Sequence, residues 1–372
     1  MSKYLIFGGL GFIGRNLVKF LIDQKAASKI RVVDKQIPET ACLGEYFQAY
    51  FNHPSVERLQ INLANAEATK RAFQGNHFDY VVNLAAETKY GQDDPVYEEH
   101  IVNIAVNIGK EAHDHQVQRF IHISTAQVYD ADKKPSKEND KIKPWTKIAE
   151  FHKKAEDELL KLSLPLIILR PAVVYGPGDT IGLTPRFICG AVYSHLKEKM
   201  QFLWTNDLKI NTVHVRDVAG AIVILAQKGV NGEIYNLSDK TETDQQKLAD
   251  ILSLLFRIEI GFVGAAKSTV AQVSMKSIVE DINEKHMKPW NDLCRAAGIT
   301  NTLLSPFIDQ ELLYKNPLSV DGTKIEGLGF KYLHPQLNPV LVKEVVDSYI
   351  QQGLFPVPKD YPKPQVQAIP KF

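Results

Sequence analysis

Hydrophobic residues in the first half of the chain follow two alternating patterns. Short apolar runs, each closed by a polar residue or glycine, are typical of the buried strands of a parallel sheet. Longer segments between them carry apolar residues at helical spacing, which is typical of amphipathic helices. The predicted strands are 4–7, 30–33, 59–61, 80–86, 119–125 and 165–170, and the predicted helices are 12–22, 66–73, 97–113 and 147–161.

This alternation predicts an α/β fold in residues 1–180, with a doubly wound parallel sheet covered by helices on both faces. After Pro171 the pattern is less regular. Two strand patterns flank a helical one within residues 211–238, and this segment is expected to return to the sheet. Residues 181–210 and 239–354 are mostly helical in pattern and are expected to form a smaller C-terminal cap over the strand ends.

The last segment, residues 355–372, contains five prolines and no helical pattern. Proline-rich segments adopt extended, polyproline-like conformations. We expect an extended arm that is either loose or laid on a surface, and that docks the protein into an assembly with a partner protein. Deleting the arm is then expected to leave the fold intact and to weaken that assembly.

Composition and charge exclude several classes of protein. With 44% hydrophobic and 23% charged residues the chain can bury a large core, so most of it is not disordered. A net charge of +1 provides no extended field of one sign, so nucleic acid is not expected as a partner. Cys42, Cys189 and Cys294 have no paired spacing, so neither a disulfide framework nor a metal site is expected.

The apolar runs are too short for a membrane span, which needs about 18–20 residues. The N-terminal residues lack the composition of a signal or transit peptide. We therefore expect a cytoplasmic protein without membrane insertion, and leave open its attachment to a larger cellular structure.

A glycine-rich loop follows the first predicted strand. Gly8, Gly9, Gly11 and Gly14 satisfy the spacings GxxGxxG and GxGxxG together. Such loops make a tight strand-to-helix turn and let a pyrophosphate approach the backbone N–H groups at the helix start. Asp34 closes the second strand, 20 residues after Gly14, where a carboxylate binds the ribose hydroxyls and repels a 2′-phosphate.

The order of strand, loop, helix, strand and acid predicts a dinucleotide-binding Rossmann domain, with NAD favoured over NADP. Lys35, next to Asp34, weakens that preference slightly. The alternative is a structural glycine turn that binds no ligand. The predicted cofactor-binding residues are Gly8, Gly11, Phe12, Ile13, Gly14, Asp34, Asn62, Leu63, Ala85 and Ala86.

Five segments together resemble the extended short-chain dehydrogenases/reductases, in the NAD-dependent epimerase/dehydratase group. They are the glycine loop, 83–86 (NLAA), 124–129 (STAQVY), 169–179 (LRPAVVYGPGD) and 213–217 (VHVRD). The resemblance covers about residues 4–240. It implies NAD as cofactor, a substrate site in the cap, and a homodimer formed through helices of the fourth and fifth strand units.

The family's catalytic pattern is incomplete in this chain. The resemblance implies a Ser or Thr after the fifth strand, matched by Thr125, and a Tyr-x-x-x-Lys pair on the next helix. In that pair a tyrosinate takes a proton from the substrate, and the lysine one turn later lowers its pKa. Aligning Pro144 and Glu156 with the family puts Ile148 and His152 at the two positions.

Other alignments do not restore the pair. Sliding the helix by two residues gives Glu150 and Lys154, and the formal matches Tyr129/Lys133 and Tyr193/Lys197 lie in the wrong part of the fold. Ala126 and Gln127 replace the acid pair of the dehydratase branch, so sugar dehydration by that route is not expected.

Some residues are candidates for a replacement base. His152 has the right pKa range for a proton carrier, and Tyr90 lies in the loop after the fourth strand. The helix 147–161 also carries Lys153 and Lys154, which fit an exposed face equally well. Thr125 and His152 are the catalytic candidates.

Two functional hypotheses follow. The first is an NAD(P)-binding protein with degenerate catalysis and a structural or regulatory role in an assembly. The second is an active nucleotide-sugar epimerase or oxidoreductase with a base other than tyrosine, in which Arg186 holds a diphosphate. Arg186 equally suits a helix cap or a surface ion pair.

Overall fold

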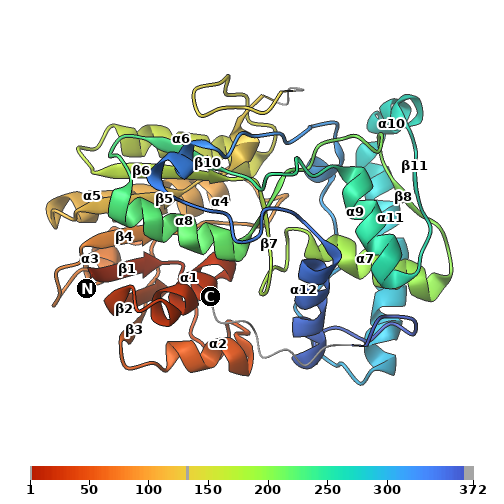
Figure 1. The fold of residues 1–372 in the computed structure, drawn as a ribbon, viewed down its shortest axis with the longest axis horizontal. Coiled ribbons are helices and arrows are strands. Elements are labelled where there is room, and N and C mark those ends of the chain that lie inside the picture. The colour runs from red at the N-terminus through yellow and green to blue at the C-terminus, as the bar shows by residue number, and fades with distance from the viewer. Residues whose placement is uncertain (1, 131–133, 364–372) are drawn as a thin grey trace.

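The computed structural model describes residues 2–130 and 134–363. Its centre is a sheet of seven parallel strands in the order β10-β6-β5-β4-β1-β2-β3 (Figure 1). The strands are β1 (Ser2–Phe7), β2 (Ala27–Asp34), β3 (Val56–Gln60), β4 (Tyr80–Asn83), β5 (Arg119–Ile123), β6 (Leu166–Pro171) and β10 (Ile234–Leu237). The predicted doubly wound parallel sheet is confirmed.

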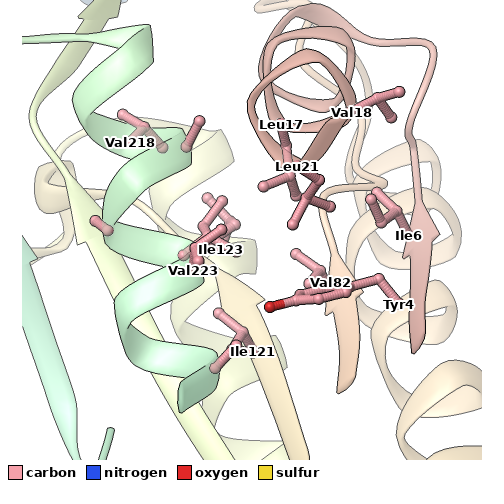
Figure 2. Close-up of a cluster of buried hydrophobic side chains, with 14 of the residues drawn as sticks. Tyr4, Ile6, Leu17, Val18, Leu21, Val82, Ile121, Ile123, Val218 and Val223 are labelled. Atoms are coloured by element: carbon pink, nitrogen blue, oxygen red, sulfur yellow. The ribbon is translucent and has the colours of Figure 1, made fainter. Parts of the chain in front are cut away.

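Side chains alternate between the two faces of this sheet, because successive residues of a strand point to opposite sides. Tyr4 and Ile6 of β1 pack with α1 (Phe12–Asp23) and α8 (Val215–Lys228), as Figure 2 shows. Leu5 and Phe7 belong to the core on the other face, with α5 (Ile104–Asp114) and α6 (Lys147–Leu160). Both faces of the inner strands are buried, so β1, β4 and β6 contain continuous apolar runs, whereas the edge strand β3 is only partly buried.

Several short elements complete this part of the molecule. α3 (Ala66–Lys70) is shorter than the predicted helix 66–73, and the predicted helix 97–113 is interrupted by a π-helical segment, Glu98–Asn103, between α4 (Asp94–Tyr97) and α5. α2 (Gly44–Phe51) has no counterpart among the predicted helices. The remaining short elements are β7 (Val173–Tyr175) with β9 (Thr212–His214), and the 3-10 turns Ala126–Val128 and Lys324–Leu328.

A second hydrophobic core lies beside the sheet (Figure 1). Its largest helices are α7 (Thr184–Leu196), α9 (Gln245–Phe256), α11 (Met275–Ala296) and α12 (Pro339–Gln351). β8 (Met200–Phe202), β11 (Ile260–Phe262), α10 (Ala265–Gln272) and the 3-10 turn Gln310–Leu313 complete it. The predicted mostly helical C-terminal region is confirmed.

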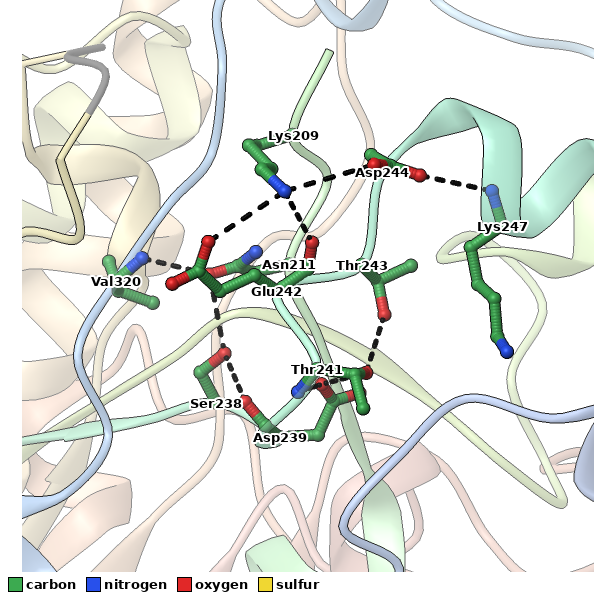
Figure 3. A network of polar contacts seen from close by, with 10 residues as sticks. All are labelled: Lys209, Asn211, Ser238, Asp239, Thr241, Glu242, Thr243, Asp244, Lys247 and Val320. Atoms are coloured by element: carbon green, nitrogen blue, oxygen red, sulfur yellow. Dashed lines mark hydrogen bonds and ion pairs between the residues drawn. The ribbon is translucent and has the colours of Figure 1, made fainter. Parts of the chain in front are cut away.

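Polar contacts join the segment before β9 to the segment that leads into α9 and to Val320. The Lys209 ammonium lies within 3.8 Å of the carboxylates of Glu242 and Asp244, and the backbone N–H of Val320 donates to the Asn211 side chain at 2.9 Å; Figure 3 draws these contacts as dashed lines. These contacts hold together three segments that are far apart in the sequence. Asp244 is also the N-cap of α9, which fixes where that helix begins.

The first half of the proline-rich segment is packed on the second core. Phe355 is 2% exposed and its ring lies 5.3 Å from that of Trp290 in α11. The Tyr361 hydroxyl donates to Asp347 of α12 at 3.1 Å. The expectation that the whole segment can be removed without harm to the fold is therefore wrong for residues 355–363. Residues 364–372 lie outside the described residues.

A fully buried ion pair links α6 to the sheet. The Arg170 guanidinium donates to both carboxylate oxygens of Glu156, at 2.9 and 2.5 Å, and both side chains are 2% exposed or less. Arg170 also donates to the Tyr129 hydroxyl at 2.8 Å, which in turn donates to Asn236 of β10 at 2.7 Å. The pair and its hydrogen bonds therefore fix α6, β6 and β10 relative to one another.

Replacing Glu156 with Leu is expected to reduce the free energy of unfolding by about 3–5 kcal/mol, because it leaves the Arg170 charge buried without a partner. The double variant Glu156→Leu/Arg170→Met is expected to recover most of that loss. Urea unfolding measures both. Asp157→Asn, in the partly exposed pair with Lys153, serves as the control and should change stability by less than about 1 kcal/mol. If Glu156→Leu reduced the free energy of unfolding as little as the control, the buried pair of Glu156 with Arg170 would not stabilise the fold.

Candidate functional site

The glycine loop connects β1 to α1 at the carboxyl edge of the sheet. Gly8 has φ +72°, and a Cβ there would lie 2.7 Å from the Ala85 nitrogen. A Cβ on Gly14 would lie 2.5 Å from the Gly8 carbonyl oxygen. Glycine is thus required at one position by the backbone conformation and at the other by the close packing of loop and helix.

Gly11 is the N-cap of α1, and no side chain caps the helix there. A Cβ on Gly11 would meet only the Gly8 carbonyl oxygen, at 3.2 Å, so the loop is open on that side. Phe12 and Ile13 follow as the first helical residues. A helix start with uncapped N–H groups and little side-chain bulk fits a pyrophosphate.

Asp34 lies beside this loop at the end of β2. Its Oδ2 accepts a hydrogen bond from the Leu10 N–H at 3.1 Å and its Oδ1 one from the Gln36 N–H, also at 3.1 Å. The carboxylate is thereby held next to the open side of the glycine loop, as a ribose-binding acid would be.

The other predicted cofactor-binding residues lie on the loops after β3 and β4. Asn62 is exposed, and its side-chain oxygen accepts from the Ala64 N–H at 3.2 Å, whereas the Leu63 side chain is in the core. Ala85 and Ala86 are half-buried, and the backbone of Ala85 lies next to Gly8. Since Phe7 is in register with Asn83 of the neighbouring strand, these loops and the glycine loop leave the sheet at one edge. The residues present therefore fit a dinucleotide.

Thr125 follows β5 at the same edge. Its hydroxyl accepts from the Gln127 N–H at 3.2 Å, so it caps the short turn Ala126–Val128. The Gln127 side chain donates to the Tyr90 hydroxyl at 3.3 Å and accepts from Thr146, the N-cap of α6, at 2.8 Å. Tyr90 and Thr125 are therefore joined through one residue, a contact that sequence spacing did not reveal.

The rotation of α6 distinguishes the residues of the two alignments by their burial. Ile148 and His152 are each 7% exposed and lie on the same face as Glu156, whereas Glu150 and Lys154 are exposed. The residues of the alternative alignment, Glu150 and Lys154, thus lie on the solvent side of the helix. α6 contains no tyrosine, and its lysines Lys147, Lys153 and Lys154 form ion pairs with acids.

The His152 imidazole is buried in α6. Burial lowers its pKa to about 4, and its Nδ1 has no hydrogen-bond partner among the described residues. The ring of His122, whose pKa burial and His152 lower to about 3, lies 6.2 Å away. Both imidazoles are therefore neutral at physiological pH.

Two acids of the family-like motifs serve the fold. Asp179 accepts backbone hydrogen bonds from four successive residues, 181–184, at the start of α7. Asp217 accepts from the N–H groups of Leu333 and His334 at 2.6 and 3.0 Å. Burial raises the pKa of both carboxyl groups, that of Asp217 to about 6.

A cavity of about 340 Å³ opens between the loop after β4, the start of α7 and residues 303–312. Tyr90 and Arg186 both line it, so the two candidate residues from distant segments are brought together. Arg186 is not engaged in a helix cap or an ion pair among the described residues, contrary to two of the roles considered for it.

Residues 2–130 and 134–363 contain no cluster of three metal-ligating side chains. They also contain no helix that is long and apolar enough to cross a membrane.

Asp34→Asn is expected to lower the preference for NAD over NADP about tenfold, because it removes the charge that repels a 2′-phosphate while an amide oxygen can still accept from Leu10. Titration of both dinucleotides by fluorescence measures the ratio of dissociation constants. Glu39→Gln, an exposed charge change in the next loop, should leave the ratio as it is. An unchanged ratio in Asp34→Asn would remove Asp34 from the cofactor site.

Buried His152 is also expected to make the fold sensitive to acid. The unfolded chain takes up a proton near pH 6.5 but the folded protein only near pH 4, so stability falls as the pH is lowered between these values. In His152→Leu the slope of unfolding free energy against pH should be smaller by about 1.4 kcal/mol per pH unit in this window. Urea unfolding at several pH values tests this, with exposed His77→Leu as the control.

Comparison with known proteins agrees with this geometry. The family model described as "NAD dependent epimerase/dehydratase family" matches residues 4–238. Human dTDP-D-glucose 4,6-dehydratase is 25% identical over 301 residues, which cover 78% of this chain and 81% of that protein. A ketoreductase of Stigmatella aurantiaca, named for a farnesyl dihydroquinoline oxide, is 24% identical over 67% of this chain and 72% of its own.

Among solved structures, the dTDP-glucose 4,6-dehydratase DesIV of Streptomyces venezuelae, solved with NAD bound, superposes with a TM-score of 0.69 at 20% identity, covering 94% of this chain and 97% of that one. This likeness concerns the fold. The resemblance to the extended short-chain dehydrogenases/reductases and the expectation of NAD as cofactor are confirmed at the level of the family. The chain belongs to the NAD-dependent epimerase/dehydratase family.

Proposed function

We propose that this protein binds NAD but has lost the proton relay of its family, and that it acts as a structural or regulatory subunit. One observation carries the proposal. Ile148 and His152 occupy the inward positions of α6, and the ion pair of Glu156 with Arg170 holds the helix in that rotation. A buried isoleucine has no ionisable group, and a neutral imidazole does not lower the pKa of a neighbouring hydroxyl as a lysine does.

The remaining residues are sufficient for binding. Gly11 and the start of α1 would hold the pyrophosphate, Asp34 the ribose, and Thr125 a hydroxyl near the end of β5. Bound NAD would supply a hydride acceptor. Nothing in α6 would remove the proton that must leave the substrate in the same step.

A second candidate is an active epimerase or oxidoreductase that uses Tyr90. It is favoured by the hydrogen bond from Gln127 to Tyr90, which places a phenol close to Thr125 and in the wall of the cavity. Burial raises the pKa of Tyr90 to about 12, so the phenol is protonated at neutral pH. Tyr90 would thus begin as a proton donor, whereas oxidation of an alcohol needs a base.

Partners belong to the same proposal. We infer docking through residues 364–372, since 355–363 are engaged in the second core. We infer a homodimer through α5 and α6 from the family alone; the exposed charges of α6, such as Glu150 and Lys154, would have to find partners in that interface. The division into the ranges 1–180 with 211–238, 181–210 with 239–354, and 355–372, and a cytoplasmic location, remain predictions.

The test is to load the protein with NAD and add dTDP-glucose or UDP-glucose. We expect NAD binding, no NADH absorbance at 340 nm in a single turnover, and no epimerised or dehydrated sugar by NMR. Turnover that Tyr90→Phe abolishes would establish the second candidate instead. Turnover that persists in Tyr90→Phe but disappears in His152→Leu would overturn both assignments.

A further inference from the structure

Arg15 lies in the first turn of α1, directly after the glycine loop, and its guanidinium is surrounded by backbone carbonyl oxygens. Its Nε donates to the Gly11 carbonyl at 3.3 Å and its Nη2 to the Leu10 carbonyl at 2.8 Å, both within the glycine loop. Nη2 and Nη1 also donate to the carbonyls of Ala41 and Cys42, at 2.9 and 3.1 Å. These four hydrogen bonds of one side chain join the glycine loop to the loop between β2 and α2.

The loop between β2 and α2, residues 35–43, directly follows Asp34. The Leu10 N–H donates to the Asp34 carboxylate and the Leu10 carbonyl accepts from Arg15, so Leu10 connects the two charged side chains. The far end of the loop is held as well, since the Arg15 guanidinium lies 5.6 Å from the centre of the Phe47 ring in α2. Because Asp34 is the acid that would bind the ribose, this loop lies at the adenosine end of the proposed dinucleotide site.

The loop 35–43 has a backbone conformation that its own residues do not favour. Cys42 has φ +49°, in the left-handed region that residues with a Cβ rarely adopt. Such a conformation persists only where the surroundings impose it. Arg15 binds the carbonyl of Cys42 and that of the residue before it, so we expect the loop to leave this conformation when the guanidinium is removed.

The aliphatic part of Arg15 contacts a third segment, the turn 176–179 that leads toward α7. Gly178 has φ +97°, and a Cβ there would lie 3.2 Å from the Arg15 Cδ, so the side chain packs directly on this glycine. The neighbouring Asn16 donates from its side chain to the Pro177 carbonyl at 2.9 Å. The first turn of α1 therefore holds both the loop after β2 and this turn next to the glycine loop.

We propose that Arg15 is a positioning residue for the dinucleotide, which holds the loop 35–43 against the glycine loop in the conformation that receives the adenosine half. This inference rests on the proposed binding of NAD. A loop that is ordered before the ligand arrives loses less conformational entropy on binding. Arg15 therefore raises the affinity through the loop and without a contact of its own to the ligand.

Calorimetric titration of the full-length protein with NAD and with ADP-ribose, which lacks the nicotinamide, tests this role. We expect Arg15→Met to weaken both ligands by the same factor, about tenfold, because the loop faces only the half that they share. Arg15→Lys keeps the charge, but a single ammonium group cannot bind the carbonyls of both loops, so it should recover little of the loss. Full recovery in Arg15→Lys would show that the charge acts alone and would overturn the proposal, as would a loss confined to NAD.

Arg119 provides a matched control. It also donates to two backbone carbonyls, those of Gly229 at 3.0 Å and Ala226 at 2.8 Å, but it lies at the start of β5, at the opposite edge of the sheet. Arg119→Met and Arg15→Met should both lower the melting temperature, by about 2–4 °C. Only Arg15→Met should change the two dissociation constants, and equal weakening by Arg119→Met would overturn the proposal in favour of a general loss of structure.

Hydrogen exchange measures the order of the loop itself. The N–H groups of Thr40 and Ala41 both donate to the Ile37 carbonyl within the loop. Without ligand, they should exchange about tenfold faster in Arg15→Lys than in the unsubstituted protein, because the loop opens more often. Equally fast exchange in the two proteins would show that Arg15 does not order the loop, and would overturn the proposal.

Two further outcomes separate this inference from the proposed function. An unsubstituted protein that binds neither NAD nor ADP-ribose would overturn both, whereas equal binding by the unsubstituted protein and Arg15→Met would overturn the role of Arg15 alone. If Arg15→Met does not fold, Arg15→Lys and Arg15→Gln, which keep more of the side chain, are compared with the unsubstituted protein instead. Failure of every Arg15 variant to fold would show an arginine that serves the fold, and would overturn the proposal.

Discussion

The buried pair of Arg170 and Glu156 is the interaction on which the site depends. It is made in a region where neither charge reaches water, so the free energy of leaving either one alone is high. Glu156 lies one turn after His152 in α6, and the pair therefore fixes the rotation of the whole helix. Ile148 and His152 are buried on the same face of the helix as a consequence.

The second constraint is the direction of the strands. All seven are parallel, so the loops after β1, β2, β4 and β5 leave from one edge, and Gly11, Asp34 and Thr125 all lie at that edge. The second core is held to this edge by charged contacts of its own. Arg216 of α8 forms a two-pronged ion pair with Glu344 of α12, and Asp217 binds the backbone of Leu333 and His334.

Much of this was predictable from sequence because it rests on local pattern. The glycine loop, the acid after β2 and the alternation of strands and helices each occupy short, continuous segments, and the family model covers them. The contact of Tyr90 with Gln127 was not predictable, because it joins residues 37 positions apart. The meeting of Arg186 with residues 303–312 depends in the same way on how two distant segments pack.

The packing of Phe355 and Tyr361 shows a different limit. Prolines indicated an extended backbone, and the segment 355–363 contains no helix or strand. Composition does not indicate, however, whether an extended segment is solvated or buried. Two aromatic side chains decided this, since each removes a large apolar area from water when it packs against a core.

The cavity lined by Tyr90 and Arg186 has one wall, residues 303–312, with an evolutionary consequence. Residues 303–312 are far in sequence from the glycine loop, and substitutions there change the lining of the cavity without touching the loop or Asp34. Selection can therefore act separately on the glycine loop with Asp34 and on residues 303–312. A lineage that retains the glycine loop and Asp34 under purifying selection is free to exchange residues 303–312. Paralogues of this chain should therefore diverge first in residues 303–312.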